Sequence, residues 1–455
     1  MSSRVGFFSL CPAQPSIREE NVFILVVVLV LAIFAIRKMA FAMALGGGCA
    51  PPRRKPETEL KHFLAVLHVV LRLERYDEPT NRKGLTPMKR NLITFAAAAL
   101  SLCMALGVGA AAAFAEASPY VFSYDDMFTK RDLKQTADLK GAVEYIVTDG
   151  QDIHIAEAGV YVLTGNAQNA TVYVEAGKDD KVQLVLDGLT IINQDAPAVY
   201  VKSADKVFVT TAADSALAVT GVFDSGDKAD GVIYSKSDLV LNGTAALTIS
   251  STENGVVGKD DLKITGGAYR ITARDAAVEA NDSIRIADGT LELTAGTDGL
   301  HAENSSDDAL GYIYIAGGTL TIEAQDDGIH AGSVFEMNDG RLTVAAAEGV
   351  EATYVQINGG SLTVNGRDDG INAGRKSGAY APKVEINGGA VTVTMATGDA
   401  DGIDSNGDIA IHGGVVNVTG GSSFDCDGTA EYTGGTLIVN GQTLDEIPLT
   451  SDSRG

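Results

Sequence analysis

The chain has 455 residues, of which 45% are hydrophobic, 51 are glycine and none is tryptophan, and its formal net charge is −24. The apolar fraction is sufficient for a core and excludes a wholly disordered chain, while the low proline content excludes a collagen or a proline-rich linker. Because so acidic a protein repels other anions, we expect neither nucleic acid nor a lipid surface as a partner of its acidic part.

The charge divides the chain into two unlike parts. Residues 1–115 are net basic, and the remainder carries the whole acidic excess. From Met88, a basic start is followed by an apolar stretch and then by Ala113-Phe114-Ala115. This order is typical of a secretory signal peptide with its cleavage site. We therefore predict a signal peptide over residues 88–115 and a secreted, extracellular protein from residue 116 onward.

Residues 1–87 precede this signal. Because a signal peptide acts at the start of a nascent chain, we interpret residues 1–87 as a mis-annotated N-terminal extension with a short apolar segment. The alternative retains them as part of the protein. The apolar run from Val22 to Ile36, lengthened to Leu45, would then anchor the protein in a membrane through residues 22–45.

The acidic part is a repeat protein. An aliphatic segment, a pair of glycines and a β-branched segment recur with a period of about 20–29 residues, which is typical of a solenoid. Ile315–Ile322 and Ile357–Leu362 are two copies. A second motif interleaves with the first, as in Asp327-Gly328-Ile329-His330-Ala331. Each repeat thus holds three short segments in which apolar and polar residues alternate. This two-residue period indicates strands, and three strands in one repeat leave no room for a helix.

Successive copies of such strands can form hydrogen bonds only by stacking in parallel. The sequence therefore predicts an all-β fold, a right-handed parallel β-helix with three strands per coil. We place this domain at residues 116–440 and a C-terminal tail at residues 441–455.

Alternation within the second motif predicts that the aliphatic residue after glycine points inward and that its neighbours point outward. Carboxylates in these outward columns would lie about 4.8 Å apart and repel one another. A hard cation with oxygen ligands would relieve this repulsion, and Ca²⁺ is the ion that we expect. An open alternative is that each aspartate caps a tight turn beside glycine. The candidate ligands are Asp298, Asp327, Glu348, Asp369, Asp401, Asp404 and Asp427.

Outward-pointing polar and aromatic side chains are candidates for carbohydrate binding. Without tryptophan, a sugar ring can stack only on tyrosine or phenylalanine, and Tyr312 and Tyr314 alternate with isoleucines and are expected to point outward. Two alternatives stay open: a transition metal at the histidines, or simple decoration of a sheet face. The candidate residues are His301, His330, Glu351, Asn372, Tyr312, Tyr314 and Tyr354.

Several motifs resemble one bacterial family. Lys181–Gly188, Asp326–His330, Asp401–Ile409 and Phe424–Thr429 are similar to the carbohydrate-binding domain-containing proteins, long regarded as a domain of unknown function. The resemblance runs from about Thr129 to Asn440. It implies a secreted β-helix of pectate-lyase-like shape that binds calcium and plant-wall polysaccharide such as cellulose or polygalacturonate, without established catalysis.

These observations favour a monomeric, non-catalytic polysaccharide-binding protein. A polysaccharide lyase or hydrolase is one alternative, in which Arg367 and Arg375, flanking the turn at Asp369, are candidate bases. A cell-surface adhesin or structural β-helix is another. Because the protein is strongly acidic, we expect an anionic glycan to bind only through bridging Ca²⁺.

Overall fold

The computed structural model describes residues 121–224, 228–396 and 400–449. The chain divides into two compact units, Met1–Glu116 and Ala117–Gly455, and all the described residues belong to the second. The predicted extension 1–87, its segment 22–45 and the predicted signal peptide 88–115 lie outside the described residues. Within the described part, no helix is both long enough and apolar enough to span a membrane.

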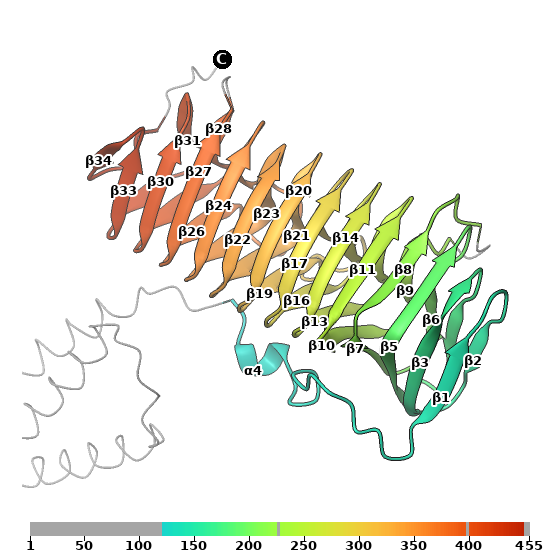
Figure 1. Ribbon diagram of the computed structural model, residues 1–455. Coiled ribbons are helices and arrows are strands. Elements are labelled where there is room, and N and C mark those ends of the chain that lie inside the picture. The colour runs from blue at the N-terminus through green and yellow to red at the C-terminus, as the bar shows by residue number, and fades with distance from the viewer. Residues whose placement is uncertain (1–120, 225–227, 397–399, 450–455) are drawn as a thin grey trace, which may run out of the picture. The chain divides into compact units, whose positions relative to one another are not determined.

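The described residues form an all-β, β-helix-like fold. They contain 34 strands and one short helix, α4 (Tyr124–Met127). All the strand pairings are parallel except the last, in which β34 (Gln442–Leu444) turns back antiparallel on β33 (Thr436–Val439). Figure 1 shows the strands stacked side by side from β1 to β33. The prediction of an all-β parallel architecture is therefore confirmed.

The parallel pairings form three continuous series, in each of which every strand pairs with the next one named. Series A consists of β2 (Ile153–Ile155), β4 (Val172–Glu175), β6 (Val199–Ser203), β9 (Gly231–Ser235), β12 (Asn254–Gly258), β15 (Val278–Ala280), β18 (Leu300–Ala302), β21 (Asp327–Met337), β23 (Glu348–Ile357), β25 (Ile371–Ala373), β28 (Asp401–Ser405) and β31 (Ser422–Cys426). Series B consists of β1 (Val143–Val147), β3 (Gly159–Gln168), β5 (Lys181–Asn193), β7 (Lys206–Ala213), β10 (Asp238–Gly243), β13 (Asp261–Ile264), β16 (Ser283–Ile286), β19 (Tyr312–Ile315), β21, β23, β26 (Lys383–Ile386), β29 (Asp408–Ile411) and β32 (Ala430–Tyr432). Series C starts at β5 and continues through β8 (Ser215–Val219), β11 (Ala246–Ser251), β14 (Ala268–Ala273), β17 (Thr290–Ala295), β20 (Thr319–Ala324), β22 (Arg341–Ala346), β24 (Ser361–Gly366), β27 (Ala390–Met395), β30 (Val415–Thr419) and β33.

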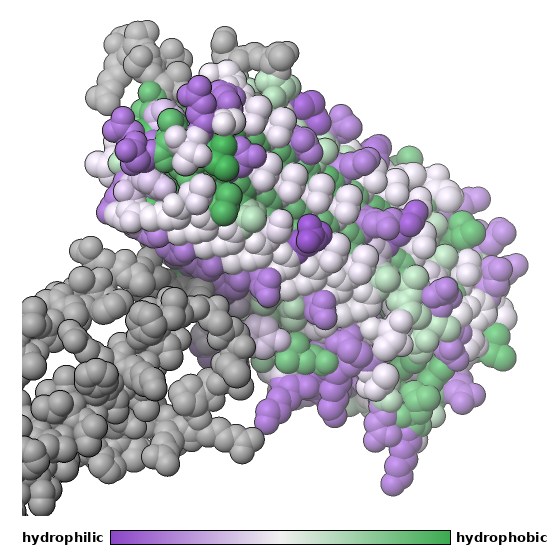
Figure 2. All heavy atoms as spheres, turned by 60° about the vertical axis from the view of Figure 1, so that its left-hand side comes forward, coloured by the Kyte–Doolittle hydropathy of each residue, from purple (hydrophilic) through white to green (hydrophobic). Residues whose placement is uncertain are grey.

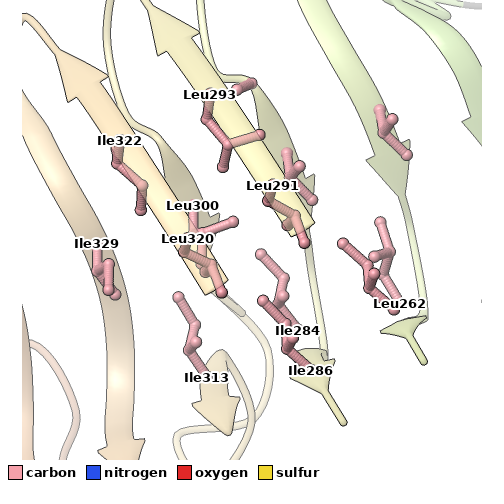
Figure 3. Close-up of a cluster of buried hydrophobic side chains, with 14 of the residues drawn as sticks. Leu262, Ile284, Ile286, Leu291, Leu293, Leu300, Ile313, Leu320, Ile322 and Ile329 are labelled. Atoms are coloured by element: carbon pink, nitrogen blue, oxygen red, sulfur yellow. The ribbon is translucent and has the colours of Figure 1, made fainter. Parts of the chain in front are cut away.

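The core is built from aliphatic side chains that stack on their copies in the neighbouring strand. Leu291 pairs with Leu320, and Leu300 pairs with Ile329, in register. These side chains are fully buried, and Figure 3 shows them pointing into the space that the three series enclose. Burying one such side chain stabilises the fold by about 1.5–3 kcal/mol. The two-residue alternation of the sequence thus fixes which side chains enter the core.

The glycine pairs turn the chain sharply between series B and series C. The second glycine of each pair has a positive φ, for example 75° at Gly360. A Cβ atom at Gly360 would lie 2.7 Å from the carbonyl oxygen of Gly340 in the preceding repeat. Only glycine therefore allows the backbones to stack closely at this corner. On the face shown in Figure 2, rows of residues of similar hydropathy run across successive strands.

An N-terminal segment, residues 121–135, crosses the outward face of series B, and we call it the strap. At one end, the backbone N–H of Phe122 donates to the Glu336 carboxylate at 2.9 Å. At the other end, Arg131 lies 4.6 Å from the ring centre of Phe208 on β7. The strap thus spans strands from β7 to β21, all of which lie far from it in the sequence.

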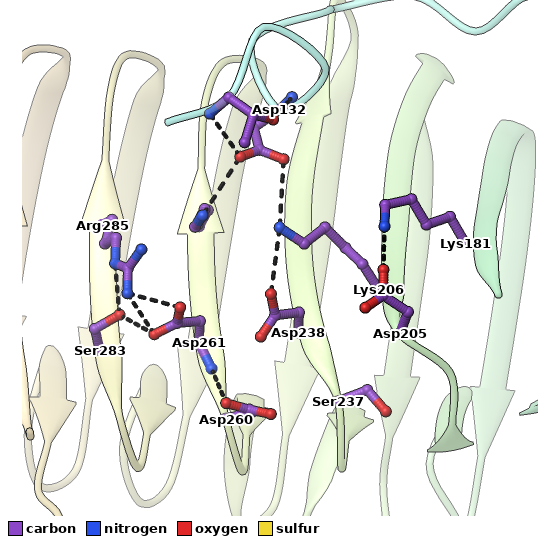
Figure 4. Close-up of polar contacts among 12 residues, drawn as sticks. Asp132, Lys181, Asp205, Lys206, Ser237, Asp238, Asp260, Asp261, Ser283 and Arg285 are labelled. Atoms are coloured by element: carbon purple, nitrogen blue, oxygen red, sulfur yellow. Dashed lines mark hydrogen bonds and ion pairs between the residues drawn. The ribbon is translucent and has the colours of Figure 1, made fainter. Parts of the chain in front are cut away.

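A buried carboxylate fixes the strap electrostatically. Asp132 is fully buried, and its carboxylate oxygens lie 3.6 Å from Lys206 Nζ and 3.4 Å from Lys263 Nζ (Figure 4). The Thr265 hydroxyl also donates to the backbone carbonyl of Asp132 at 2.5 Å. Both lysines are themselves largely buried, and Lys206 also lies 3.2 Å from Asp238, so Asp132 is the ion-pair partner of Lys263 and shares Lys206 with Asp238.

Replacing Asp132 by alanine removes the carboxylate that pairs with the buried Lys263, and it leaves Lys206 with Asp238 alone. We expect this to destabilise the docked strap by about 3 kcal/mol. The measurement is limited trypsinolysis, which should cut Asp132→Ala within the strap, at Lys130, Arg131 or Lys134, much faster than the parent protein. Asp126→Ala, which alters an exposed carboxylate of the strap, is the control. Equal cleavage rates for the two variants would contradict the role of Asp132.

Candidate functional site

One outward-facing file of side chains runs along the whole of series A. Its members occupy the position after the inward aliphatic residue, and the strand register places each one beside the next. We call this set the site file. It consists of His154, Tyr173, Tyr200, Tyr234, Val257, Glu279, His301, His330, Glu351, Asn372, Asp404 and Asp425. One end of the file is therefore aromatic and the other is acidic.

A second column flanks the acidic end of the site file. It holds the residue before glycine in each motif, and backbone N–H groups tie its members together. The N–H of Asp327 donates to Asp298 at 3.0 Å, and the N–H of Asp401 donates to Asp369 at 3.1 Å. The structure thus brings together, as predicted, Asp298, Asp327, Glu348, Asp369, Asp401 and Asp404 beside His301, His330, Glu351 and Asn372.

The predicted ligand Asp427 does not join them. The register pairs Asp401 with Ser422 and Asp404 with Asp425, whereas Asp427 is exposed in the turn after β31. The prediction was wrong because Asp427-Gly428 looks like another copy of the Asp-Gly motif. The true copy is Ser422-Ser423-Phe424-Asp425, in which Phe424 fills the aliphatic core position. Accepting an aromatic residue in that position would have identified Asp425.

The tyrosines proposed for sugar stacking belong to series B pairings, Tyr312 and Tyr314 on β19 and Tyr354 in the part of β23 that pairs with β26. Tyr312 and Tyr314 point outward from β19, as expected, but the strap covers them. Phe122 stacks on Tyr312 with ring centres 4.4 Å apart, and only 6% and 1% of Tyr312 and Tyr314 are exposed. Tyr354 is half-buried, and its hydroxyl donates to Glu385 at 2.6 Å. Tyr312 and Tyr314 therefore offer no open ring face.

Three carboxylates meet at the acidic end of the site file. Ligand oxygens of Asp401, Asp404 and Asp425 all lie within 4.8 Å of one another, and the three residues are half-buried. Burial, with the charges of Asp369 and Asp401, raises the pKa of Asp404 to about 6. Across residues 121–224, 228–396 and 400–449, no lysine, arginine or histidine forms an ion pair with Asp404 or Asp425. This cluster consists of oxygen donors alone, which a hard cation fits.

The two preceding repeats each add one oxygen ligand, Asn372 in β25 and Glu348 at the start of β23. The Asn372 side-chain N–H donates to Glu348 at 3.0 Å, while Asn372 Oδ1 is buried and accepts no hydrogen bond. Burial and the nearby charge of Glu351 raise the pKa of Glu348 to about 7. An orphaned amide oxygen beside a destabilised carboxylate indicates that this part of the file also lacks a positive partner.

A compensated cluster lies at the centre of the file. His330 Nδ1 is 2.7 Å from Asp327 and 3.0 Å from Glu351, and Lys376 Nζ is 2.7 Å from the other oxygen of Glu351. Burial opposes the charged imidazole, but the hydrogen bonds to both carboxylates outweigh it and raise the pKa of His330 to about 10. Burial likewise opposes ionisation of Glu351, yet His330 and Lys376 lower its pKa to about 2. Here the acids already have cationic partners.

Two loops, residues 303–311 and 374–382, adjoin this central cluster. Ser377 donates to the carbonyl of Asp308 at 2.5 Å, and the N–H of Gly378 donates to its carboxylate at 3.2 Å. The second loop supplies Lys376, which sequence reasoning missed because nothing in a loop sequence reveals which repeat it will contact. The contact between the loops bridges the two intervening repeats, which contain no such insertion.

The aromatic end of the file was also missed. His154 and Tyr173 stack with ring centres 5.0 Å apart, and Lys202 Nζ lies 4.5 Å from the Tyr173 ring centre. Tyr173 is half-buried and His154 is exposed, whereas Tyr200 and Tyr234 are only 2% and 4% exposed. The signal was available, since Val172-Tyr173-Val174 and Val199-Tyr200-Val201 repeat the same alternation.

These pKa shifts predict how stability depends on pH when no cation is bound. The folded-state pKa values of Asp404 and Glu348 are raised above their ordinary values of 3.8 and 4.5. The folded state thus binds these protons more tightly, so the free energy of unfolding falls as pH rises from about 4.5 to 7. The raised pKa of His330 acts in the same direction above about pH 6.5. Urea unfolding in chelator measures this, and Glu348→Gln should flatten the slope between pH 5 and 7. A stability that rises across this range would contradict the shifts.

The chain is similar to proteins of one described family. Residues 149–400 match the profile of the family described as "Carbohydrate-binding domain-containing protein". A carbohydrate-binding domain-containing protein of Acetivibrio thermocellus is 31% identical over 138 residues, which are 29% of this chain and 48% of that protein. The match thus spans about half of the relative's length.

A solved structure was also matched. A polysaccharide lyase-like protein from C. thermocellum, as a gadolinium derivative, is 29% identical and aligns with a TM-score of 0.44, covering 49% of this chain and 96% of that one. The family profile covers more than half of the 455 residues. The chain therefore belongs to the family of carbohydrate-binding domain-containing proteins.

Proposed function

We propose that this protein is a secreted, monomeric, non-catalytic polysaccharide-binding protein that holds Ca²⁺ between stacked carboxylates. The proposal rests on the site file. It has aromatic rings at one end and, at the other, the carboxylates of Asp404 and Asp425, which lack a basic ion-pair partner among the described residues. The signal peptide expected at residues 88–115 supports secretion.

The proposal includes the finer geometry of the fold. We infer a right-handed β-helix with three strands per coil, since successive strands of the chain pair into the three series A, B and C and crossovers between parallel strands are almost always right-handed. A repeat of about 20–29 residues accommodates three short strands and the turns between them. This geometry keeps the site file on one flank, where a linear polymer can lie across several repeats at either end, while Tyr200, Tyr234 and Val257 between the two ends are buried.

Asp401, Asp404 and Asp425 would hold the calcium ion. Their oxygens are close enough to share one cation, and Ca²⁺ takes 6–8 oxygen ligands with flexible geometry. A bound Ca²⁺ would supply positive charge on an otherwise acidic face and would accept the carboxylate of a uronate residue. Glu348, Asp369 and Asn372 extend the run of oxygen donors along the file. Asp298 and Asp327, by contrast, are paired with histidines and are poorer candidates.

The glycan would lie along series A. Tyr173 and His154 offer stacking surface for the apolar face of a sugar ring, which suits a neutral glucan such as cellulose. The acidic end would repel polygalacturonate unless Ca²⁺ bridged the carboxylates of both partners. One file could thus serve both classes of plant-type polysaccharide, with calcium required for only one of them.

Binding is favoured over catalysis by the contacts of the candidate base Arg367. Its guanidinium donates to the backbone carbonyls of Gln325 at 2.7 Å and of Ala324 at 3.3 Å. A guanidinium held by the backbone in this way braces neighbouring repeats and is poorly placed to take a proton from a sugar. Arg375 is exposed in the loop 374–382.

The calcium proposal predicts a cation-dependent stabilisation. At a Ca²⁺ concentration 100 times the dissociation constant, the parent protein should gain about 2.7 kcal/mol of unfolding free energy. Asp404→Asn should lose most of this gain, while Asp427→Asn, which alters an exposed aspartate outside the cluster, should keep it. Thermal unfolding with and without Ca²⁺ measures both. Equal gains in the two variants would reject this ligand set.

The glycan proposal predicts two separable kinds of retention on polysaccharide. Polygalacturonate should retain the protein in Ca²⁺ and release it in EDTA, and Asp404→Asn should weaken this retention. Cellulose should retain the protein in either buffer, and Tyr173→Ala should weaken that retention, whereas Tyr124→Ala, at an exposed tyrosine of the strap, should not. Affinity electrophoresis measures both. Release of an unsaturated product that absorbs in the ultraviolet would instead establish a lyase.

A further inference from the structure

The two adjacent histidines of the site file are not used by the calcium proposal. We propose that His301 and His330, with carboxylates of Asp298, Asp327 and Glu351, form a second metal site for a transition-metal ion of the Zn²⁺ class. This site lies on β18, β21 and β23, whereas the proposed calcium ligands lie on β28 and β31. The two sites are therefore separate, and either can exist without the other.

The side chains already converge. His301 Nδ1 lies 2.6 Å from Asp298 Oδ2, and His330 Nδ1 lies 2.7 Å from Asp327 Oδ2. The two imidazoles are stacked nearly parallel, with ring centres 4.6 Å apart. Ligand atoms of Asp298, His301 and His330 all lie within 4.8 Å of one another, and so do those of Asp327, His330 and Glu351. His330 belongs to both groups.

The donor set favours a transition metal over calcium. Two imidazoles with carboxylates suit Zn²⁺, Cu²⁺ or Ni²⁺, whereas Ca²⁺ takes oxygen ligands. Each histidine also has an aspartate three residues earlier that binds one ring nitrogen. A metal ion that displaced the proton between each ring nitrogen and its aspartate would therefore meet one nitrogen and one oxygen ligand at each histidine.

One ring nitrogen is left without a partner. His330 Nε2 is buried from solvent and makes no hydrogen bond. The Nε2 atom of His301 lies nearest the neighbouring Glu303, at 3.7 Å from its carboxylate. Buried polar atoms in folded proteins are nearly always satisfied, so the hydrogen bonds of the metal-free cluster leave the His330 ring incompletely satisfied. A metal ion that His330 shares with Asp327 and Glu351 would be bound by Nδ1, the nitrogen that faces both carboxylates.

A closed network without metal is the competing explanation. A proton held by His330 between Asp327 and Glu351, with Lys376 on the second oxygen of Glu351, also balances the carboxylates. The two explanations differ in what they predict for added metal. A cluster that is already balanced by a proton binds no added metal ion. The proposed site binds one metal ion, and both histidines are needed for that binding.

The test is equilibrium dialysis of the chelator-stripped full chain against Zn²⁺ and, separately, against Ca²⁺. The parent protein should bind one Zn²⁺ ion tightly. His301→Gln should bind that ion with an affinity weaker by about tenfold or more. His154→Gln, which alters an exposed histidine at the far end of the same file, is the control and should bind as the parent does. Substituting Co²⁺ should give a visible absorption band that depends on His301.

His301 is chosen because it is more exposed than His330, so its replacement is tolerated more readily. Circular dichroism confirms that His301→Gln is folded. If His301→Gln and His154→Gln bind Zn²⁺ as the parent protein does, or if the parent binds none, the proposal is wrong and the proton network is the correct account. Loss of Ca²⁺ binding in Asp404→Asn leaves this conclusion unchanged, because the two sites share no ligand.

Discussion

The structure depends on one constraint, the in-register stacking of parallel strands about 4.8 Å apart. Each residue of a strand lies directly beside its counterpart in the next repeat, so whatever the sequence repeats is concentrated into a file. For aliphatic residues this is favourable, and Ile329, Val350 and Ile371 form part of a continuous buried ladder. For carboxylates the same geometry is unfavourable, because like charges cannot move apart without breaking the register.

Along the site file, the repulsion between stacked carboxylates is compensated in one place and not in another. At the centre, His330 and Lys376 balance Asp327 and Glu351. Toward β31, Asp404 and Asp425 have no basic side chain among their ion-pair partners in the described chain, and the pKa of Asp404 is raised to about 6 by burial and neighbouring charge. Carboxylates without a basic partner, at the β31 end, would attract a hard cation more strongly than the balanced centre. The proposed function follows from this contrast and not from the number of acidic residues.

The alternation of the sequence predicts much of this arrangement. It places His301 beside His330 and Asn372 beside Asp404, because both follow from counting positions after a buried aliphatic residue. It does not reveal that Ser422 takes the column position expected for Asp427 or that Asp425 joins the site file, because Phe424 and two serines disguise the last copy of the motif. It also does not reveal the fate of Tyr312 and Tyr314. Their cover, the strap, comes from a much earlier part of the chain, and no local pattern records that contact.

The central claim is that strand register gathers Asp401, Asp404 and Asp425 into one cation site on series A. A crystal structure grown with calcium, with anomalous diffraction data, tests this most directly. The account predicts one anomalous peak bound by oxygens of all three aspartates, with Asp427 outside its coordination shell. A peak bound by Asp427, or a register that places Asp404 and Asp425 on different faces, would contradict it.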